Sequence, residues 1–296
     1  MEIIIHNPSH SGDILHTLEM VKILINSNPT CKFKLAPASC KCLYNDLIGQ
    51  NIEIIKHNCI WDTKKQKNVL ITADIITKLH NVLVYYEDKK LYINMWKMLV
   101  QNNTNCINLL GRTSFIKNTI HEMNLKFNLN IQFNCDNDKQ LIPILPDINI
   151  DKTENYLKSL NKKLIFFYNL TSTCGIESEY GTNINDNVIK KLLSEIDEDT
   201  VLLVAKKTDI LCDKIIYVDC DLNNPLSNDG ENLLVNEKIS RLCDKIYFKI
   251  NGGSLFILNN INIENEQKFY LIKSTNCNNW YNILKKSYLF KNINIY

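Results

Sequence analysis

Short apolar segments alternate with amphipathic ones along most of the chain, and this alternation constrains the fold more than any other feature. The chain opens with an apolar segment at 2–5, an amphipathic segment at 14–26 and a second apolar segment at 31–35. The apolar residues of 14–26 recur at helical spacing, which predicts a helix with one buried face. Strands that alternate with helices are joined by crossover connections, so the sequence predicts a parallel sheet in an α/β fold.

The same alternation extends to the end of the chain in two runs. In the first run we expect further strands at 51–55, 69–71, 82–85 and 106–110, and helices at 39–48, 91–101 and 114–123. In the second run we expect strands at 163–168, 201–205, 215–218 and 245–250, and helices at 152–160, 187–195, 236–243 and 278–289.

Pro143 and Pro146 follow a polar stretch at 134–140 and predict a linker between the two runs. The expected domains are therefore 1–145 and 146–296, each a Rossmann-like α/β domain, with the helix at 278–289 packing back on the first domain. Ligands bind at the carboxyl ends of strands in doubly wound sheets, so two such domains are expected to face each other across a ligand-binding cleft.

The composition of the 296 residues excludes several classes of protein. A formal net charge of +2 with a charged fraction of 22% is not typical of a protein that coats nucleic acid. The apolar fraction of 45% is enough for a full core, but no apolar run approaches the roughly 20 residues that cross a bilayer. The 11 cysteines follow no secretory signal, so we expect reduced thiols and a cytoplasmic protein.

The loop between the first strand and the first helix is the first candidate site. Ser11 and Gly12 stand where the backbone N–H groups of a helix start are free for an anion or a sugar oxygen. Asp13 is placed either to cap the helix or to face the cleft as a general base, and the two roles are compatible. His16 follows within one turn, as a structural histidine or as part of the same site. No G-x-S-x-G nucleophile elbow is present.

The segment Gly12-Asp13-Ile14-Leu15-His16-Thr17-Leu18 resembles the G-D-[IV]-L-H-T-L-P segment that opens the bacterial heptosyltransferases, the family 9 glycosyltransferases. Its position after the first strand also matches, although Glu19 stands where that family has Pro. The resemblance implies the glycosyltransferase B architecture, with an acceptor-binding first domain and a donor-binding second domain. It also implies that Asp13 is the base that deprotonates the acceptor hydroxyl.

The second domain has loops where the resemblance implies a nucleotide-sugar diphosphate. Hydroxyls, an amide and the main chain can hold phosphate without a metal. Lys206 follows the strand at 201–205, where a cation would neutralise the leaving diphosphate. In the last loop Asn251 replaces the family's Asp, and no His follows. The expected diphosphate-binding residues are Asn169, Thr171, Ser172, Thr173, Lys206, Asn251, Gly252, Gly253 and Ser254.

The predicted function is a glycosyltransferase that moves a sugar from a nucleotide-sugar donor to a glycan, lipid-linked or protein acceptor, with no metal and no other cofactor. Two alternatives stay open. The substitution at Asn251 allows a non-catalytic binding protein on the same fold. Asp219-Cys-Asp221 after a strand allows a metal-dependent glycosyltransferase instead. A dinucleotide-binding enzyme is disfavoured, because no G-x-G-x-x-G or P-loop sequence is present.

Overall fold

The chain folds into two compact units, Met1–Pro146 and Asp147–Tyr296. The boundary lies one residue from the expected division after residue 145. Each unit is described by itself. The computed structural model describes residues 1–7, 11–49, 51–55, 59–62, 67–70, 83–95, 97–98, 113–135, 143–170, 182–225, 227, 229–249, 253–258, 268–272 and 293–296.

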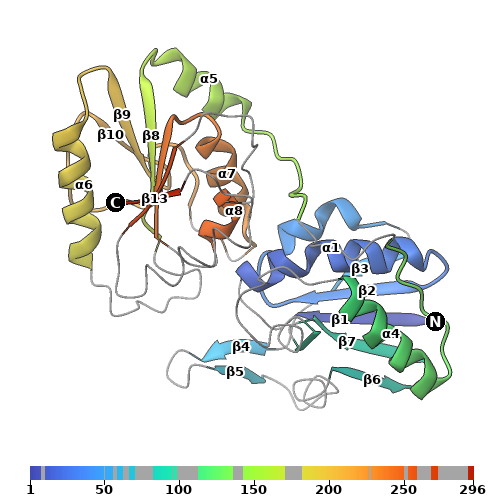
Figure 1. The fold of residues 1–296 in the computed structure, drawn as a ribbon. Coiled ribbons are helices and arrows are strands. Elements are labelled where there is room, and N and C mark those ends of the chain that lie inside the picture. Colours follow the sequence, from blue (N-terminus) through green and yellow to red (C-terminus); the bar gives the residue numbers. More distant parts are fainter. Residues whose placement is uncertain are drawn as a thin grey trace. The chain divides into compact units, whose positions relative to one another are not determined.

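The first unit is built on a five-stranded sheet with the order β3-β2-β1-β7-β6 (Figure 1). Apart from the edge strand β6, the paired strands run parallel. A separate antiparallel pair joins β4 and β5. The strands are β1 (Glu2–Asn7), β2 (Lys32–Pro37), β3 (Ile52–Ile54), β4 (Cys59–Asp62), β5 (Lys67–Leu70), β6 (Val84–Glu87) and β7 (Lys90–Asn94).

Helix α1 (Ser11–Ser27) follows β1 directly and contributes much of the apolar core of this unit. Its buried positions include Ile14, Leu15 and Leu18, as the helical spacing predicts. The segment 41–47 is a 3₁₀ helix, η1 (Lys41–Leu47), and the last described helix of the unit is α4 (Thr113–Phe127).

The sequence prediction of a helix at 91–101 is wrong at its start, because residues 90–94 form strand β7. Asp88 and Lys89 both have positive φ, at 51° and 61°, and Glu87 pairs with Lys90 across them. Two consecutive residues with positive φ are typical of a type I′ turn, which joins antiparallel strands in a tight hairpin. The apolar residues after Lys90 therefore continue a hairpin, and β6 adds an antiparallel edge to a sheet that was expected to be parallel throughout.

The second unit contains a six-stranded sheet with the order β10-β9-β8-β11-β12-β13, and all its strand pairs are parallel. The first strand in sequence, β8, lies inside the sheet, as in doubly wound α/β folds. The predicted α/β class is thus confirmed. The strands are β8 (Lys163–Tyr168), β9 (Thr200–Val204), β10 (Ile215–Tyr217), β11 (Lys245–Phe248), β12 (Lys268–Leu271) and β13 (Ile293–Ile295).

Helices cover both faces of this sheet (Figure 1). Ile189 and Leu192 of α6 pack with Phe167, Leu202 and Val204 of the sheet in one buried cluster. Helices α7 and α8 lie on the opposite face. The helices are α5 (Asp151–Ser159), α6 (Thr182–Glu195), α7 (Glu231–Ser240) and α8 (Ser254–Leu258). The helix expected at 278–289 lies outside the described residues.

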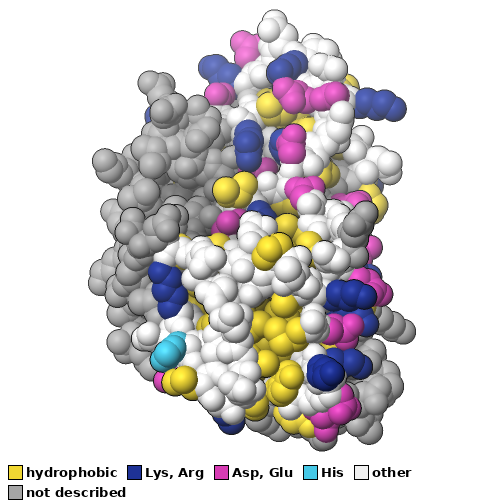
Figure 2. All heavy atoms as spheres, turned by 90° about the vertical axis from the view of Figure 1, so that its right-hand side faces the viewer, with side chains coloured by type: hydrophobic (Ala, Val, Ile, Leu, Met, Phe, Trp, Pro, Cys, Tyr) yellow, Lys and Arg dark blue, Asp and Glu magenta, His cyan; other side chains and the backbone are white. Residues whose placement is uncertain are grey.

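The described part of the face in Figure 2 is mixed in charge. Lys and Arg side chains are interspersed with Asp and Glu over the described part of the face in Figure 2, without an extended area of one sign. Among the described helices, none is both long and apolar enough to cross a membrane.

Candidate functional site

The strand order of the second unit defines a topological switch point between β8 and β11. From β8 the chain proceeds outward through β9 and β10 on one side, and from β11 through β12 and β13 on the other. In doubly wound sheets, ligands bind outside the carboxyl ends of the strands at this point. The residues that follow β8 and β11 therefore form the candidate site of this unit.

Asn169 follows β8 directly and joins the ends of two strands. Its side chain donates to the carbonyl oxygen of Lys206 at 2.8 Å and accepts from the N–H of Lys206 at 2.8 Å. The side chain is 2% exposed, so both functions of the amide are used in fixing the loop after β9 to the end of β8. Direct binding of phosphate by Asn169 stays a prediction; what the structure shows is a positioning role.

Lys249 follows β11 directly, and sequence reasoning did not single it out. Its ammonium donates to Oδ1 of Asn185 on α6 at 2.5 Å. The Nδ2 of Asn185 in turn donates to the carbonyl oxygen of Asn169 at 3.2 Å. One asparagine therefore connects the ends of β8 and β11 across the switch point. Burial lowers the pKa of Lys249 to about 8. The sequence feature that could have pointed to Lys249 is a lysine inside the apolar segment expected as a strand at 245–250.

Gly253 has a steric role in the structure. A Cβ at this position would overlap the hydroxyl of Tyr168 and lie 3.0 Å from its Cζ and 3.1 Å from a methyl of Leu233. Tyr168 is fully buried, so its ring has little room to move away. Gly253 was expected to approach a phosphate, but in the structure a glycine is needed there because Tyr168, the last residue of β8, leaves no room for a Cβ. Ser254, the next expected residue, begins α8 and is also fully buried.

The other expected donor-side residues are distributed as follows. The Lys206 side chain is exposed and its backbone is held by Asn169. Thr171, Ser172, Thr173, Asn251 and Gly252 lie outside the described residues. Their roles stay predictions.

In the first unit, Ser11, Gly12 and Asp13 are the first three residues of α1. Gly12 is buried. The side chains of Ser11 and Asp13 lie outside the described part of the structure, so the role of Asp13 as a base stays a prediction.

His16 is one turn further along α1 and is 2% exposed. Burial lowers its pKa to about 4, so the imidazole is neutral at pH 7. Neither ring nitrogen has a hydrogen-bond partner among the described residues. Its neighbour Thr17 is part of a buried polar contact, since Nδ2 of Asn7 donates to its hydroxyl at 2.7 Å. The described contacts thus place His16 in the interior; a role toward an acceptor stays a prediction.

The two carboxylates of the alternative metal site are each bonded to the main chain. Asp219 Oδ1 accepts from the N–H of Lys207 at 2.9 Å, and Asp221 Oδ2 accepts from the N–H of Tyr217 at 2.7 Å. The first contact joins the segment after β9 to the segment after β10, and the second closes the turn that follows β10. Within the described residues, no group of three or more His, Cys, Asp or Glu side chains is arranged to hold a metal ion.

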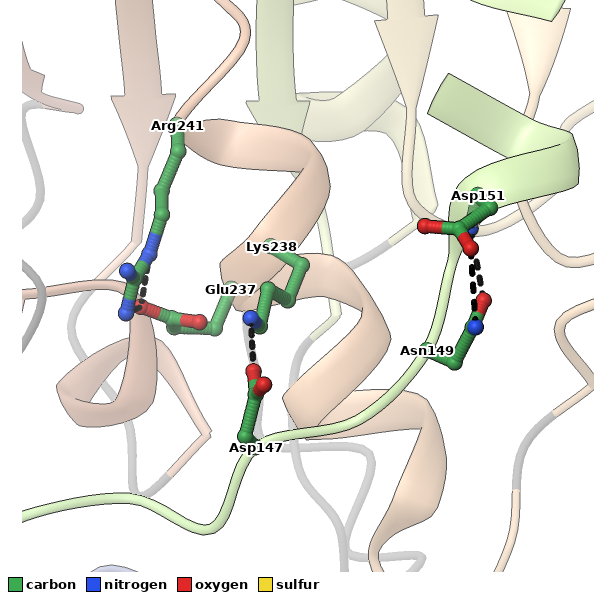
Figure 3. Close-up of polar contacts among 6 residues, drawn as sticks. All are labelled: Asp147, Asn149, Asp151, Glu237, Lys238 and Arg241. Carbon is green, nitrogen blue, oxygen red and sulfur yellow. Dashed lines mark hydrogen bonds and ion pairs between the residues drawn. The ribbon is translucent and has the colours of Figure 1, made fainter. Parts of the chain in front are cut away.

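A group of charged residues lies on and just after α7 (Figure 3). Glu237 is 1% exposed, and Oε1 accepts from Nε and Nη2 of Arg241 at 2.8 and 2.6 Å. Burial raises the pKa of Glu237, and the guanidinium opposes that rise. The next residue, Lys238, forms an ion pair with Asp147 at the start of the unit. The Lys238–Asp147 pair attaches the beginning of the unit to α7.

Comparison with known proteins gives remote structural similarity. No protein-family model and no curated protein sequence matches the chain. The chain is similar to the structure of E. coli ADP-heptose LPS heptosyltransferase II, with 10% identity, a TM-score of 0.44, and coverage of 100% of this chain and 90% of that one. It is also similar to E. coli heptosyltransferase WaaC with ADP, with 10% identity, a TM-score of 0.42, and coverage of 93% and 88%.

The same enzyme with ADP-2-deoxy-2-fluoro heptose gives 8% identity, a TM-score of 0.36, and coverage of 100% of this chain and 93% of that one. These solved structures are heptosyltransferases, the class that the segment 12–18 resembles. At such identities and TM-scores the similarity assigns no activity to this chain.

Proposed function

We propose that the protein is a glycosyltransferase that transfers a sugar from a nucleotide-sugar donor to an acceptor hydroxyl without an obligatory metal. The observation that supports this most is the segment Gly12–Leu18, which resembles the opening segment of the heptosyltransferases and lies at the start of α1, the first helix after β1. The donor would bind the second unit at the β8–β11 switch point, where doubly wound sheets bind ligands.

In the proposed reaction the carboxylate of Asp13 accepts the proton of the acceptor hydroxyl. The acceptor oxygen then forms a bond to the anomeric carbon as the bond from that carbon to the donor diphosphate breaks. The electron pair of the broken bond leaves with the nucleoside diphosphate. Backbone N–H groups and lysine side chains would stabilise its negative charge, which is how an enzyme of this kind works without a metal.

A second candidate is a binding protein that keeps the fold without catalysis. It is favoured by Asn251, which replaces the Asp of the family pattern. An amide there cannot act as an acid or a base, so a protein that binds nucleotide sugars but does not turn them over would fit this candidate.

The test is an assay of nucleoside diphosphate release from a panel of ADP-, UDP- and GDP-sugars, with and without acceptor glycans. Turnover of one donor is the expected result. Asp13→Asn should lower kcat by roughly 10²–10⁴-fold, as expected for loss of a general base, with little change in KM. The control is Asp46→Asn, which changes an exposed carboxyl of η1. Donor binding without turnover would favour the second candidate, and neither binding nor turnover would contradict both.

A further inference from the structure

The position of Lys249 is electrostatically unfavourable for a cation in the described structure. Its ammonium is partly buried, and burial penalises the charged form. The described partner is an amide oxygen of Asn185, which is neutral and compensates only part of the lost hydration. No carboxylate of the described residues forms an ion pair with Lys249.

The helix that carries Asn185 adds to this positive potential. Asn185 is the fourth residue of α6 and so belongs to its first turn. The N-terminal end of a helix has a partial positive charge, which disfavours a cation beside it and favours an anion. Desolvation and the helix dipole therefore both oppose the ammonium, unless a negatively charged group binds next to it.

The location of Lys249 indicates where that negative group would come from. It follows β11 at the switch point, and Asn185 connects it to the end of β8. Lys245 is placed differently, because it begins β11 and therefore lies at the amino ends of the strands. The carboxyl edge is where ligands enter a sheet of this type.

We propose that Lys249, oriented by Asn185, is the cation that binds a phosphoryl group of an anionic ligand at the β8–β11 switch point. This inference deepens the proposed function and rests on it for the identity of the ligand, a nucleoside diphosphate or its sugar ester. The ammonium contacts phosphate oxygens in place of a metal ion, and Asn185 restricts its side chain to that position.

Isothermal titration calorimetry on the full chain tests this, with sodium pyrophosphate, ADP, UDP and GDP as ligands. Lys249→Met should weaken binding of pyrophosphate and of the preferred nucleotide at least about tenfold, the scale of one charge-assisted hydrogen bond. Asn185→Asp should also weaken it, because the new carboxylate competes for the ammonium. Lys245→Met is the control and should change affinity less than about twofold. Thermal unfolding verifies that each variant is folded.

Equal pyrophosphate affinity in the wild type and Lys249→Met would overturn the inference, as would a wild type that binds none of these anions. If Lys249→Met does not fold, unchanged affinity in Asn185→Asp overturns it instead. Failure of the proposed function has a different signature. If pyrophosphate binding depends on Lys249 but no sugar is transferred, the anion site is supported and the proposed glycosyltransferase activity is contradicted. If the protein transfers a sugar but Lys249→Met binds pyrophosphate as well as the wild type, the glycosyltransferase activity is supported and the role of Lys249 is contradicted.

Discussion

The carboxylate of Glu19 accepts a hydrogen bond from the backbone N–H of Ile144 at 3.0 Å, across 125 residues of sequence. Lys22 donates to the carbonyl oxygen of the same residue at 2.7 Å and pairs with Glu19 at 3.0 Å. Two side chains of α1 thus hold both polar groups of one residue in the segment that leads to the unit boundary. Glu19 is also the residue that departs from the heptosyltransferase pattern, and this contact gives it a structural role.

Glu19→Ala should release this segment. The N–H of Ile144 loses its acceptor, so its hydrogen exchange should accelerate, and the free energy of unfolding of the first unit should fall by about 1 kcal/mol. Hydrogen exchange followed by mass spectrometry on peptides that cover 143–147 measures this. Glu122→Ala, at an exposed position on α4, is the control. Unchanged protection of Ile144 would contradict the role of Glu19.

The strands with continuous apolar residues were the most predictable part of the fold. Strand β8 has the bounds that the sequence predicts, 163–168, because a run of five buried residues has no other favourable environment. Strands β12 and β13, of four and three residues, were not expected from the sequence. A three-residue strand gains little stability alone, so it forms only beside a sheet whose existence the local sequence does not encode.

The candidate site shows a second limit of sequence reasoning. Lys249 and Asn185 are 64 residues apart, and each is of a common residue type in this chain. Their relation follows from the packing of α6 on the sheet beside the end of β11, which is a tertiary property. Gly253 was expected to bind a diphosphate, but its steric contact with Tyr168 depends on the approach of the residue before α8 to the end of β8, which are 85 residues apart in sequence.

Gly253→Ala should destabilise the second unit. The added Cβ would overlap the Tyr168 hydroxyl in a packed interior, and overpacking of this kind costs about 1–3 kcal/mol. Adding Tyr168→Phe removes the overlapping oxygen, so the double variant should be more stable than the sum of the two single effects predicts. Chemical denaturation measures both. Gly49→Ala is the control, because a Cβ there meets nothing within 4 Å. If the stability changes of Gly253→Ala and Tyr168→Phe simply add in the double variant, the proposed overlap between the added Cβ and the Tyr168 hydroxyl is contradicted.

Arg241→Met should destabilise the second unit in a pH-dependent way. Glu237 is buried, and loss of its guanidinium partner leaves an unpaired carboxylate that costs about 2 kcal/mol, less than for a fully buried pair because Arg241 is half exposed. Burial raises the pKa of Glu237, so in the folded chain its carboxyl group keeps a proton at pH values where the unfolded chain has lost it. The contribution of Glu237 to stability therefore falls as pH rises. The variant raises that pKa further.

Urea denaturation at pH 5 and pH 8 measures the effect, and the loss should be larger at pH 8. In a Glu237→Gln background, Arg241→Met should cost less and show no such difference between the two pH values. Lys158→Met is the control; its pair with Glu154 is on the surface of α5, and its loss should cost less than about 0.5 kcal/mol. An equal loss at both pH values would mean that Glu237 does not titrate in this range.

His16→Leu should change the acid stability of the first unit. Burial lowers the folded pKa of His16 from 6.5 to about 4, so the unfolded chain binds the proton first and stability is lost as pH falls through this range. The loss is about 3 kcal/mol when fully developed. Leucine removes both the titration and two buried nitrogens that have no hydrogen-bond partner among the described residues. The variant should therefore be at least as stable as the wild type at pH 7 and increasingly more stable toward pH 4. Thermal unfolding across this pH range, with the exposed His121→Leu as control, measures the difference. Parallel stability curves for wild type and His16→Leu would show that the imidazole is protonated at the same pH in the folded and unfolded chains.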